Sequence, residues 1–339
     1  MSILDAVHPG VEPSAVAGFD ALTLAAGALE ATFVPSVGMA GVSLRHSGEE
    51  LLDRRGGLRA CRDTGAVMGV PLLYPWANRL ETDDLVLAGR RVRLPGPPLV
   101  RRDEHGLPIH GLLGAHAGWS VRETSSDRER AALRAELDFA ADAALIEAFP
   151  FPHLVVVEAT LSAHSLRIAT TVRPTGAVAV PVAFGYHPYL RIPGVDRADW
   201  EVGLPARRRL QLDELLLPTG HDEPEAAAVL PLDDAGFDDG FVGLDDGAAF
   251  LVSGGGREIR VTLETGYRAA QVFSPPGAPF ICFEPMVAPA NALCTGAGLR
   301  WVAPGATFTA AFAIDVRQID GSRSSRAASQ SAWRARSCW

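Results

Sequence analysis

The sequence predicts one large all-β domain, an antiparallel sandwich or distorted barrel. Polar and apolar residues alternate with a period of two in several runs, which is the spacing of a strand with one buried face. The 339 residues include 34 glycines and 25 prolines, which punctuate these runs as the turns of a large antiparallel protein do. Helical periodicity is sparse, and residues 138–148 form the only Ala-rich stretch that suggests a helix.

Alternation is clearest in four runs of the sequence. These are AALRAELDF (131–139), HSLRIATTV (164–172), REIRVTL (257–263) and ATFTAAFAIDV (306–316). Ala88-Gly89 and Ala163-His164-Ser165 each lie between neighbouring extended stretches, so they predict hairpin turns. No internal repeat is visible, and we therefore expect a single β domain over residues 15–316.

Two flanking segments depart from the alternating pattern. Residues 1–14 precede it and are predicted to be an N-terminal extension. Residues 317–339 are rich in Arg and Ser and have no periodic apolar face, which predicts a disordered tail. Because this segment is basic, a tail that contacts phosphate groups or a membrane is the alternative.

The composition excludes several classes of function. The formal net charge is −9, so a broad basic face for nucleic acid is not expected. All basic residues are Arg, and the absence of Lys excludes both a Schiff-base lysine and a Walker A phosphate loop. The sequence has no G-x-S-x-G elbow, no dinucleotide-binding glycine motif after a strand and no H-E-x-x-H. We expect an activity that requires no cofactor.

Cysteine usage and the N-terminus point to the cytoplasm. The four cysteines, at positions 61, 282, 294 and 338, form no C-x-x-C pair and indicate no disulfide framework. The N-terminal residues lack the basic and apolar regions of a signal peptide. The longest stretch without Asp, Glu or Arg, residues 174–190, is short and broken by prolines, so no membrane span is predicted.

Glu284 and His187 are the first candidates for catalysis. Glu284 lies in the apolar run FICFEPMV, where an unpaired carboxylate is costly and burial raises the pKa of the carboxyl, as a general base requires. His187 lies between Tyr186 and Pro188, and an imidazole is well matched to proton donation near neutral pH. The alternatives are a paired structural carboxylate and a structural core histidine.

Asn78, Arg79 and His110 are candidates for binding a substrate. Arg79 ends the proline-rich segment GVPLLYPWANRL, and its guanidinium can donate to hydroxyls or carboxylates in a cleft. His110 lies between His105 and His116, but their spacing matches no helical metal-ligand pattern and no acidic residue lies among them. We therefore predict no metal site. A surface Arg that closes a loop and a structural His are the alternatives.

The segment AGFDDGFVGLDDG (235–247) contains two acidic pairs among glycines. Asp in such loops commonly stabilises turns, but Asp238 or Asp239 could hold a pair of substrate hydroxyls. Together, the candidates are a Glu and a His supported by Arg, His and Asp. This set suits proton transfer on a polyhydroxylated substrate.

Five segments carry a resemblance to a known family. In chain order they are Pro75-Trp76-Ala77-Asn78-Arg79, His110-Gly111 with Trp119, Gly185-Tyr186-His187-Pro188-Tyr189, Phe237-Asp238-Asp239-Gly240-Phe241 and Glu284-Pro285. FPFPHLVVVEATL (149–161) and APGATFTAAFAIDV (303–316) add to them. With these segments the chain resembles the aldose 1-epimerase (galactose mutarotase-like) family over roughly residues 18–316.

The resemblance implies an antiparallel β-supersandwich and the interconversion of the α and β anomers of an aldose. It implies that Glu284 takes the proton of the anomeric hydroxyl while His187 protonates the ring oxygen. Asn78, Arg79 and His110 would bind the sugar, and Asp238 would accept hydrogen bonds from its hydroxyls. Asp238-Asp239 stands where family members often have Asp-His, so Asp239 is the alternative to Asp238. A monomer or homodimer with a small-molecule sugar substrate is expected.

Three other functions compete with an aldose 1-epimerase of a free hexose or related aldose. A hexose-6-phosphate 1-epimerase would need a basic pocket, for which Arg90, Arg91 and Arg93 are candidates. A non-catalytic carbohydrate-binding protein would not need a base opposite a proton donor. A glycosidase usually requires two carboxylates that flank the bond, and only Glu284 is placed for that role.

Overall fold

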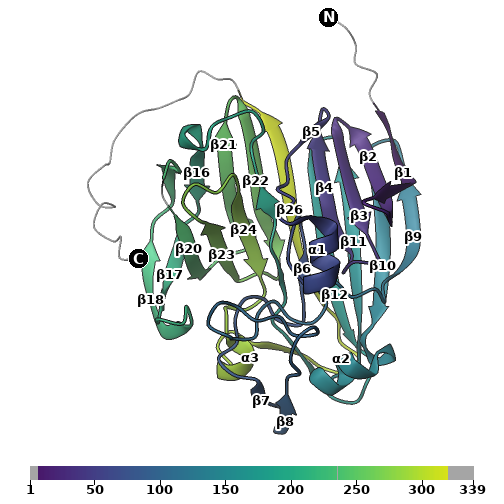
Figure 1. Cartoon of the computed structure of the whole chain (residues 1–339), viewed down its shortest axis with the longest axis vertical. Coiled ribbons are helices and arrows are strands. Elements are labelled where there is room, and N and C mark those ends of the chain that lie inside the picture. The colour runs from purple at the N-terminus through teal and green to yellow at the C-terminus, as the bar shows by residue number, and fades with distance from the viewer. Residues whose placement is uncertain (1–6, 235, 320–339) are drawn as a thin grey trace, which may run out of the picture.

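The computed structural model describes residues 7–234 and 236–319, which form three large antiparallel sheets (Figure 1). The predicted all-β fold is confirmed. The five-stranded sheet has the order β1 (Val7–Val16), β2 (Phe19–Gly27), β3 (Leu29–Val34), β4 (Ala40–His46) and β5 (Glu49–Glu50). The nine-stranded sheet has the order β19 (Ala228–Pro231), β16 (Glu201–Leu204), β21 (Ala249–Gly254), β22 (Arg257–Thr265), β26 (Phe308–Gln318), β12 (Ser165–Pro174), β11 (His153–Ser162), β10 (Arg130–Asp138) and β9 (Ser120–Ser126).

The third large sheet has eight strands and carries the candidate catalytic residues. Its order is β18 (Pro218–Glu225), β17 (Arg207–Leu212), β20 (Phe237–Val242), β23 (Ala269–Ser274), β24 (Ile281–Met286), β14 (Gly185–Tyr186) and β6 (Leu72–Leu73), with β15 (Tyr189–Leu190) also paired to β24. Two further sheets have two strands each: β7 (Asp84–Leu87) pairs with β8 (Arg90–Arg93), and β13 (Val180–Val182) pairs with β25 (Arg300–Val302). The helices are α1 (Gly57–Thr64), η1 (Phe139–Ala141), α2 (Ala143–Ala148), η2 (Arg197–Asp199) and α3 (Ala292–Thr295).

The four alternating runs form β10, β12, β22 and β26, as predicted. Ala88-Gly89 joins β7 to β8, and the turn at residues 163–164 joins β11 to β12, so both predicted hairpins are confirmed. The Ala-rich stretch 138–148 forms η1 and α2, each of which begins after an Asp whose carboxylate accepts backbone N–H groups.

The first sheet begins before the predicted boundary at residue 15. Residues 7–14 belong to β1, which pairs with β2 at the edge of the five-stranded sheet. Two prolines and a register shift between Val7 and Gly10 hide the alternation, and an edge strand tolerates both. At the other end β26 continues to Gln318, and residues 320–339 of the predicted tail lie outside the described residues.

The main hydrophobic core lies on one face of the nine-stranded sheet (Figure 1). The five-stranded sheet covers one half of that face, and the eight-stranded sheet covers the other half. β1–β3 pack on β10 and β11, while Phe283 of β24 stacks on Phe250 of β21 with ring centroids 5.6 Å apart. Within the described ranges, no helix is long and apolar enough to cross a membrane.

Alternation along β24 places Glu284 on the opposite face from this core. Ile281 and Phe283 belong to the main cluster, whereas Cys282 and Met286 belong to a smaller cluster on the outer face of the eight-stranded sheet. Val67 and Ala77, from the segments that precede and follow β6, also belong to that smaller cluster. The Glu284 side chain therefore projects from a central strand into the outer face of the sheet, which loops cover.

Candidate active site

The structure brings Glu284 and His187 into contact. Nε2 of His187 lies 3.1 Å from Oε1 of Glu284, and their side chains are 6% and 2% exposed. Glu284 is held in β24 between β23 and β14, and His187 occupies the short connection from β14 to β15. The two predicted catalytic residues, far apart in the sequence, therefore form one buried pair.

Packing fixes the orientation of the His187 ring. Its backbone N–H donates to the carbonyl of Pro71 at 3.2 Å. The imidazole stacks on the ring of Tyr189 with centroids 4.4 Å apart and planes within 6°. The ring of Phe273 meets it edge-on at 5.9 Å. These contacts leave the imidazole little freedom to turn away from Glu284.

Burial favours the neutral form of both members of the pair. It raises the pKa of Glu284 well above the usual 4.5, and the charge of Asp238 raises that pKa further. Burial lowers the pKa of His187 from 6.5 to about 3. Burial therefore favours a protonated carboxyl beside an uncharged imidazole.

His110 lies beside the pair. Its ring meets that of His187 edge-on, with centroids 5.5 Å apart and planes at 82°. Burial lowers the pKa of His110 well below 6.5, so this imidazole is neutral as well. Its buried Nδ1 has no hydrogen-bond partner among the described residues, which leaves this atom for a bound molecule. A binding role for His110, which the sequence indicates beside the alternative of a structural histidine, stays a prediction.

Gly111 permits the backbone turn that places His110. Its φ is +75°, and a Cβ there would overlap the carbonyl group of Tyr74. We expect Gly111→Ala to lower the free energy of unfolding well beyond the ~1–2 kcal/mol of left-handed strain alone, because the Tyr74 backbone must move. Activity should fall with it, because His110 is the adjacent residue.

Gly106 offers a matched control on the same segment. Its φ is +80°, but a Cβ there meets nothing within 4 Å. Gly106→Ala should therefore cost about 1–2 kcal/mol, the strain of the left-handed conformation. Urea unfolding of both variants measures the difference, and equal losses would show that the contact with Tyr74 does not constrain the turn.

Arg79 is buried and neutralised by acidic side chains. Its Nε donates to Asp103 at 2.6 Å, and its Nη2 donates to Glu104 at 3.1 Å. Asn78 Oδ1 accepts the Arg79 backbone N–H at 2.7 Å, and the Asn78 carbonyl accepts the N–H of His110 at 3.1 Å. Asn78, predicted to bind the sugar, thus directs its side-chain oxygen to Arg79 and holds its two neighbours in place.

Strand register distinguishes Asp238 from Asp239. Asp238 Oδ1 accepts a hydrogen bond of 2.6 Å from Gln271, and Gln271 pairs directly with Glu284 across β23 and β24. Asp239 points to the other face of β20, where Oδ1 lies 3.3 Å from Arg209. Asp238 is therefore the acid on the face of the candidate site.

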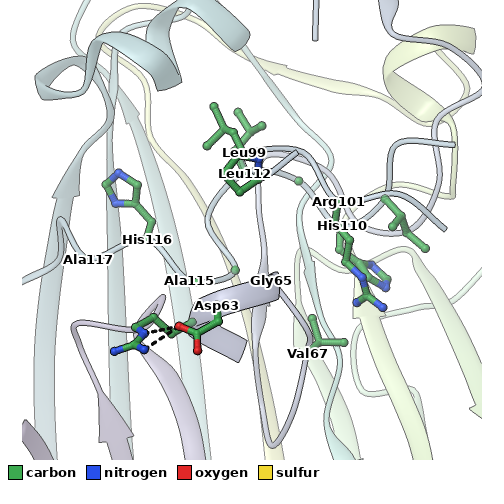
Figure 2. A pocket seen from close by; sticks show the side chains of 15 residues that line it. Asp63, Gly65, Val67, Leu99, Arg101, His110, Leu112, Ala115, His116 and Ala117 are labelled. Atoms are coloured by element: carbon green, nitrogen blue, oxygen red, sulfur yellow. Dashed lines mark hydrogen bonds and ion pairs between the residues drawn. The ribbon is translucent and has the colours of Figure 1, made fainter. Parts of the chain in front are cut away.

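A pocket of about 330 Å³ lies beside His110 (Figure 2). It is lined by His110 and Arg101 on one side and by His116 and the end of α1 on the other. Neither His187 nor Glu284 lines it, but His110, which does, has its ring in edge-on contact with that of His187. Its volume lies within the range of small-molecule sites.

The three clustered histidines do not converge. His116 Nε2 lies 3.0 Å from Asp142, and His105 lies 3.9 Å from Glu104, while His110 faces His187. Across residues 7–234 and 236–319, no group of three His, Cys, Asp or Glu side chains is arranged to hold a metal ion.

Three residues of the site were not singled out from the sequence. Gln271 links Asp238 to the strand of Glu284, Tyr189 stacks on His187, and Arg101 lines the pocket. Tyr189 belongs to the segment Gly185-Tyr186-His187-Pro188-Tyr189 that carries the family resemblance, but the sequence indicated no role of its own for it. Gln271 and Arg101 carried no local signal, because only strand register and loop packing bring them to the site.

The arrangement can move two protons at once. A carboxyl and an imidazole in contact can donate to one substrate oxygen and accept from another without a change in net charge. Arg79, Asp238 and Gln271 add donors and acceptors of the kind that sugar hydroxyls need. The acid and base lie beside each other, so the two reacting oxygens must be close together in the substrate.

Solved structures with the same fold are known. A galactose mutarotase-like protein from Clostridium acetobutylicum matches with a TM-score of 0.82 at 17% identity, covering 92% of this chain and 99% of that one. A putative aldose 1-epimerase from Escherichia coli K12 matches with a TM-score of 0.68 at 19% identity, covering 91% and 100%. Galactose 1-epimerase from Lactobacillus acidophilus NCFM matches with a TM-score of 0.72 at 15% identity, covering 92% and 99%. At these identities the likeness shows the fold.

The family follows from the sequence itself. No curated protein sequence matches the chain at a significant level. The family model for aldose 1-epimerase, in contrast, matches residues 20–315, which is nearly the whole described domain and close to the span of the predicted resemblance. The chain belongs to the aldose 1-epimerase family.

Proposed function

We propose that the protein is an active aldose 1-epimerase that interconverts the α and β anomers of a hexose or a related aldose. The contact between Glu284 and His187 is the observation that carries the proposal. The anomeric hydroxyl oxygen and the ring oxygen of a pyranose are bonded to the same carbon. A base for the first and an acid for the second must therefore lie side by side, as these two residues do.

Ring opening needs one proton removed from the anomeric hydroxyl and one given to the ring oxygen. Glu284 acts as base and His187 as acid once the proton of the carboxyl has passed to the imidazole across their 3.1 Å contact. After opening, the carboxyl holds the proton again and the imidazole is neutral, which is the form that burial favours. Rotation about the C1–C2 bond and reclosure with reversed transfers then give the other anomer.

The surrounding residues support a polyhydroxylated ring. Asp238 lies on the same face as Glu284 and accepts hydrogen bonds, while Arg79 and Gln271 donate them. The neutral His110 adds an imidazole with a free ring nitrogen beside His187. A non-catalytic sugar-binding protein would gain nothing from a buried carboxyl in contact with an imidazole, because burying such groups is costly.

The direct test is the exchange rate between the anomers. Saturation transfer between the two anomeric protons measures this rate at equilibrium, for any soluble aldose and without an optical change. We expect the protein to accelerate the exchange of at least one aldose far above the buffer rate. Failure with hexoses, pentoses and their charged derivatives would refute the proposal, as would acceleration that persists after the pair is replaced.

The pH profile provides a second prediction. The pair works with one shared proton, so activity should fall when it gains a second proton and when it loses the first. Gain of the second proton belongs to His187, whose pKa is lowered to about 3, and this sets the acid limb. Loss of the first belongs to Glu284, whose pKa is raised well above 4.5, and this sets the alkaline limb.

We therefore expect the exchange rate, corrected for the spontaneous reaction, to fall on both sides of a plateau that lies between the pKa of His187 and the raised pKa of Glu284. The acid limb should lie well below the ordinary imidazole value of 6.5, because burial disfavours the imidazolium. A rate that halves near pH 6.5 as the solution is acidified would show that His187 titrates like a solvated imidazole and that burial does not lower its pKa.

A further inference from the structure

Arg101 places an uncompensated positive charge at the site. Its guanidinium lines the pocket together with His110, and its charge acts on the His110 imidazole (Figure 2). The Arg101 carbonyl accepts the N–H of Ile109 at 3.0 Å, which fixes its backbone beside the turn that carries His110. Nη1 of Arg101 is buried and has no hydrogen-bond partner within the described protein.

The other arginine of the site is already neutralised. Arg79 donates to both Asp103 and Glu104, and the charge of Asp238 lies nearby. Arg79 can therefore donate to neutral hydroxyls, but its positive charge is already compensated by the carboxylates of the protein. Arg101, in contrast, forms no ion pair with any residue in the described ranges.

Arg55 adds to the positive charge on the same side. Its guanidinium lies 5.5 Å from the ring centroid of Tyr189, the residue that stacks on His187, and 4.8 Å from that of Phe280. The charges of Arg101 and Arg55 both act on His187. Within the described ranges, Arg55 likewise forms no ion pair. The site is thus asymmetric, with carboxylates beside Arg79 and unpaired guanidinium groups beside His187.

We propose that the natural substrate is an aldose that carries an anionic group, and that Arg101 is the ligand of that group. The proposal rests on the proposed function, because it assigns a substrate class to the same site. A buried guanidinium nitrogen without a partner is costly, and a phosphate or carboxylate oxygen satisfies it with a charge-assisted hydrogen bond. Both anions offer the paired oxygens that match its planar fork.

The structure does not support the arginines that the sequence first indicated for a phosphate. Arg90, Arg91 and Arg93 are exposed on β8, and Arg93 pairs with Asp84 at 2.9 Å. None of the three lines the pocket beside His110. Arg91 is therefore a suitable control, since it is an exposed arginine outside the site.

The test compares neutral and anionic forms of one sugar. Anomer exchange is measured with glucose, glucose 6-phosphate and glucuronate, and with galactose and its two matching derivatives, for the wild type, Arg101→Gln and Arg91→Gln. We expect the wild type to favour one anionic form over its neutral parent, and the derivative that it favours distinguishes phosphate from carboxylate. Arg101→Gln should lower kcat/KM for that form by about 10- to 100-fold while changing the neutral parent by less than about threefold.

The controls separate this proposal from the proposed function. Arg91→Gln should behave as wild type, and a loss confined to Arg91→Gln would move the anion site to β8 and overturn the proposal. A wild type that prefers neutral sugars, or an equal loss for both forms in Arg101→Gln, would also overturn it while leaving mutarotation intact.

Binding provides a readout that does not depend on turnover. Calorimetry with whichever of the four anionic sugars binds the wild type most tightly should show about 10- to 100-fold weaker binding to Arg101→Gln than to the wild type, and the difference should shrink as salt screens the charge. If no sugar is turned over at all, the proposed function fails, and this titration still decides whether Arg101 binds the anion. Equal affinities for the two proteins would overturn the proposal.

Discussion

Glu284→Gln is expected to lower kcat for anomer exchange by about 100- to 10,000-fold, the contribution of a positioned acid or base. The amide keeps the volume of the side chain and can still hydrogen-bond, but it cannot give or take a proton. The carboxyl is 2% exposed and burial raises its pKa, which favours the uncharged acid, and an uncharged amide of the same volume replaces it. The fold should therefore keep its stability.

Two measurements distinguish catalysis from binding. Sugar affinity, measured by calorimetry, should change by much less than kcat, because Arg79, Asp238 and His110 keep their positions. Glu264→Gln is the control, since that carboxyl pairs with Arg167 at 2.6 Å on a partly exposed part of β22. Near wild-type exchange in Glu284→Gln would make the carboxyl structural and would direct the search for the base to Asp238.

The two proposed catalytic residues could be singled out from the sequence because each carries a local signal. A carboxylate inside FICFEPMV has to be paired or functional, and Pro188 restrains the backbone beside His187. Their contact could not be predicted in the same way, because it depends on the pairing of β24 with β14 and β15. Local sequence thus identified the chemical groups, and the sheet determined their distance.

Strand register separates Asp238 from Asp239, which the sequence alone could not do. Asp238 and Asp239 are adjacent in sequence and equally acidic, yet alternation along β20 sends one to Gln271 and the other to Arg209. Arg101 was one of many arginines, and only the packing of its loop against His110 set it apart. The edge strand β1 was missed because its prolines hide the alternation that the central strands show.

His187→Asn is expected to cause a loss of similar size, about 100- to 10,000-fold in kcat. The amide nitrogen of Asn can take the place of one ring nitrogen in a hydrogen bond, but it cannot relay a proton. The substitution also removes the ring that stacks on Tyr189, so unfolding experiments must accompany the kinetics. A loss of activity without a matching change in sugar affinity assigns the imidazole to proton transfer.

The double variant tests whether the two residues act as a pair. If Glu284 and His187 share one proton across 3.1 Å, removing either member disables the same step. Glu284→Gln combined with His187→Asn should then cost far less than the product of the two single losses. The single variants should also lose opposite limbs of the pH profile. In His187→Asn the base Glu284 must still lose its proton, so only an acid limb should remain. In Glu284→Gln the acid His187 must still hold its proton, so only an alkaline limb should remain. Losses that multiply, with both limbs of the pH profile intact, would mean that the two residues act at separate steps. Another acid and base would then have to lie side by side to serve the anomeric oxygen and the ring oxygen, which are bonded to the same carbon.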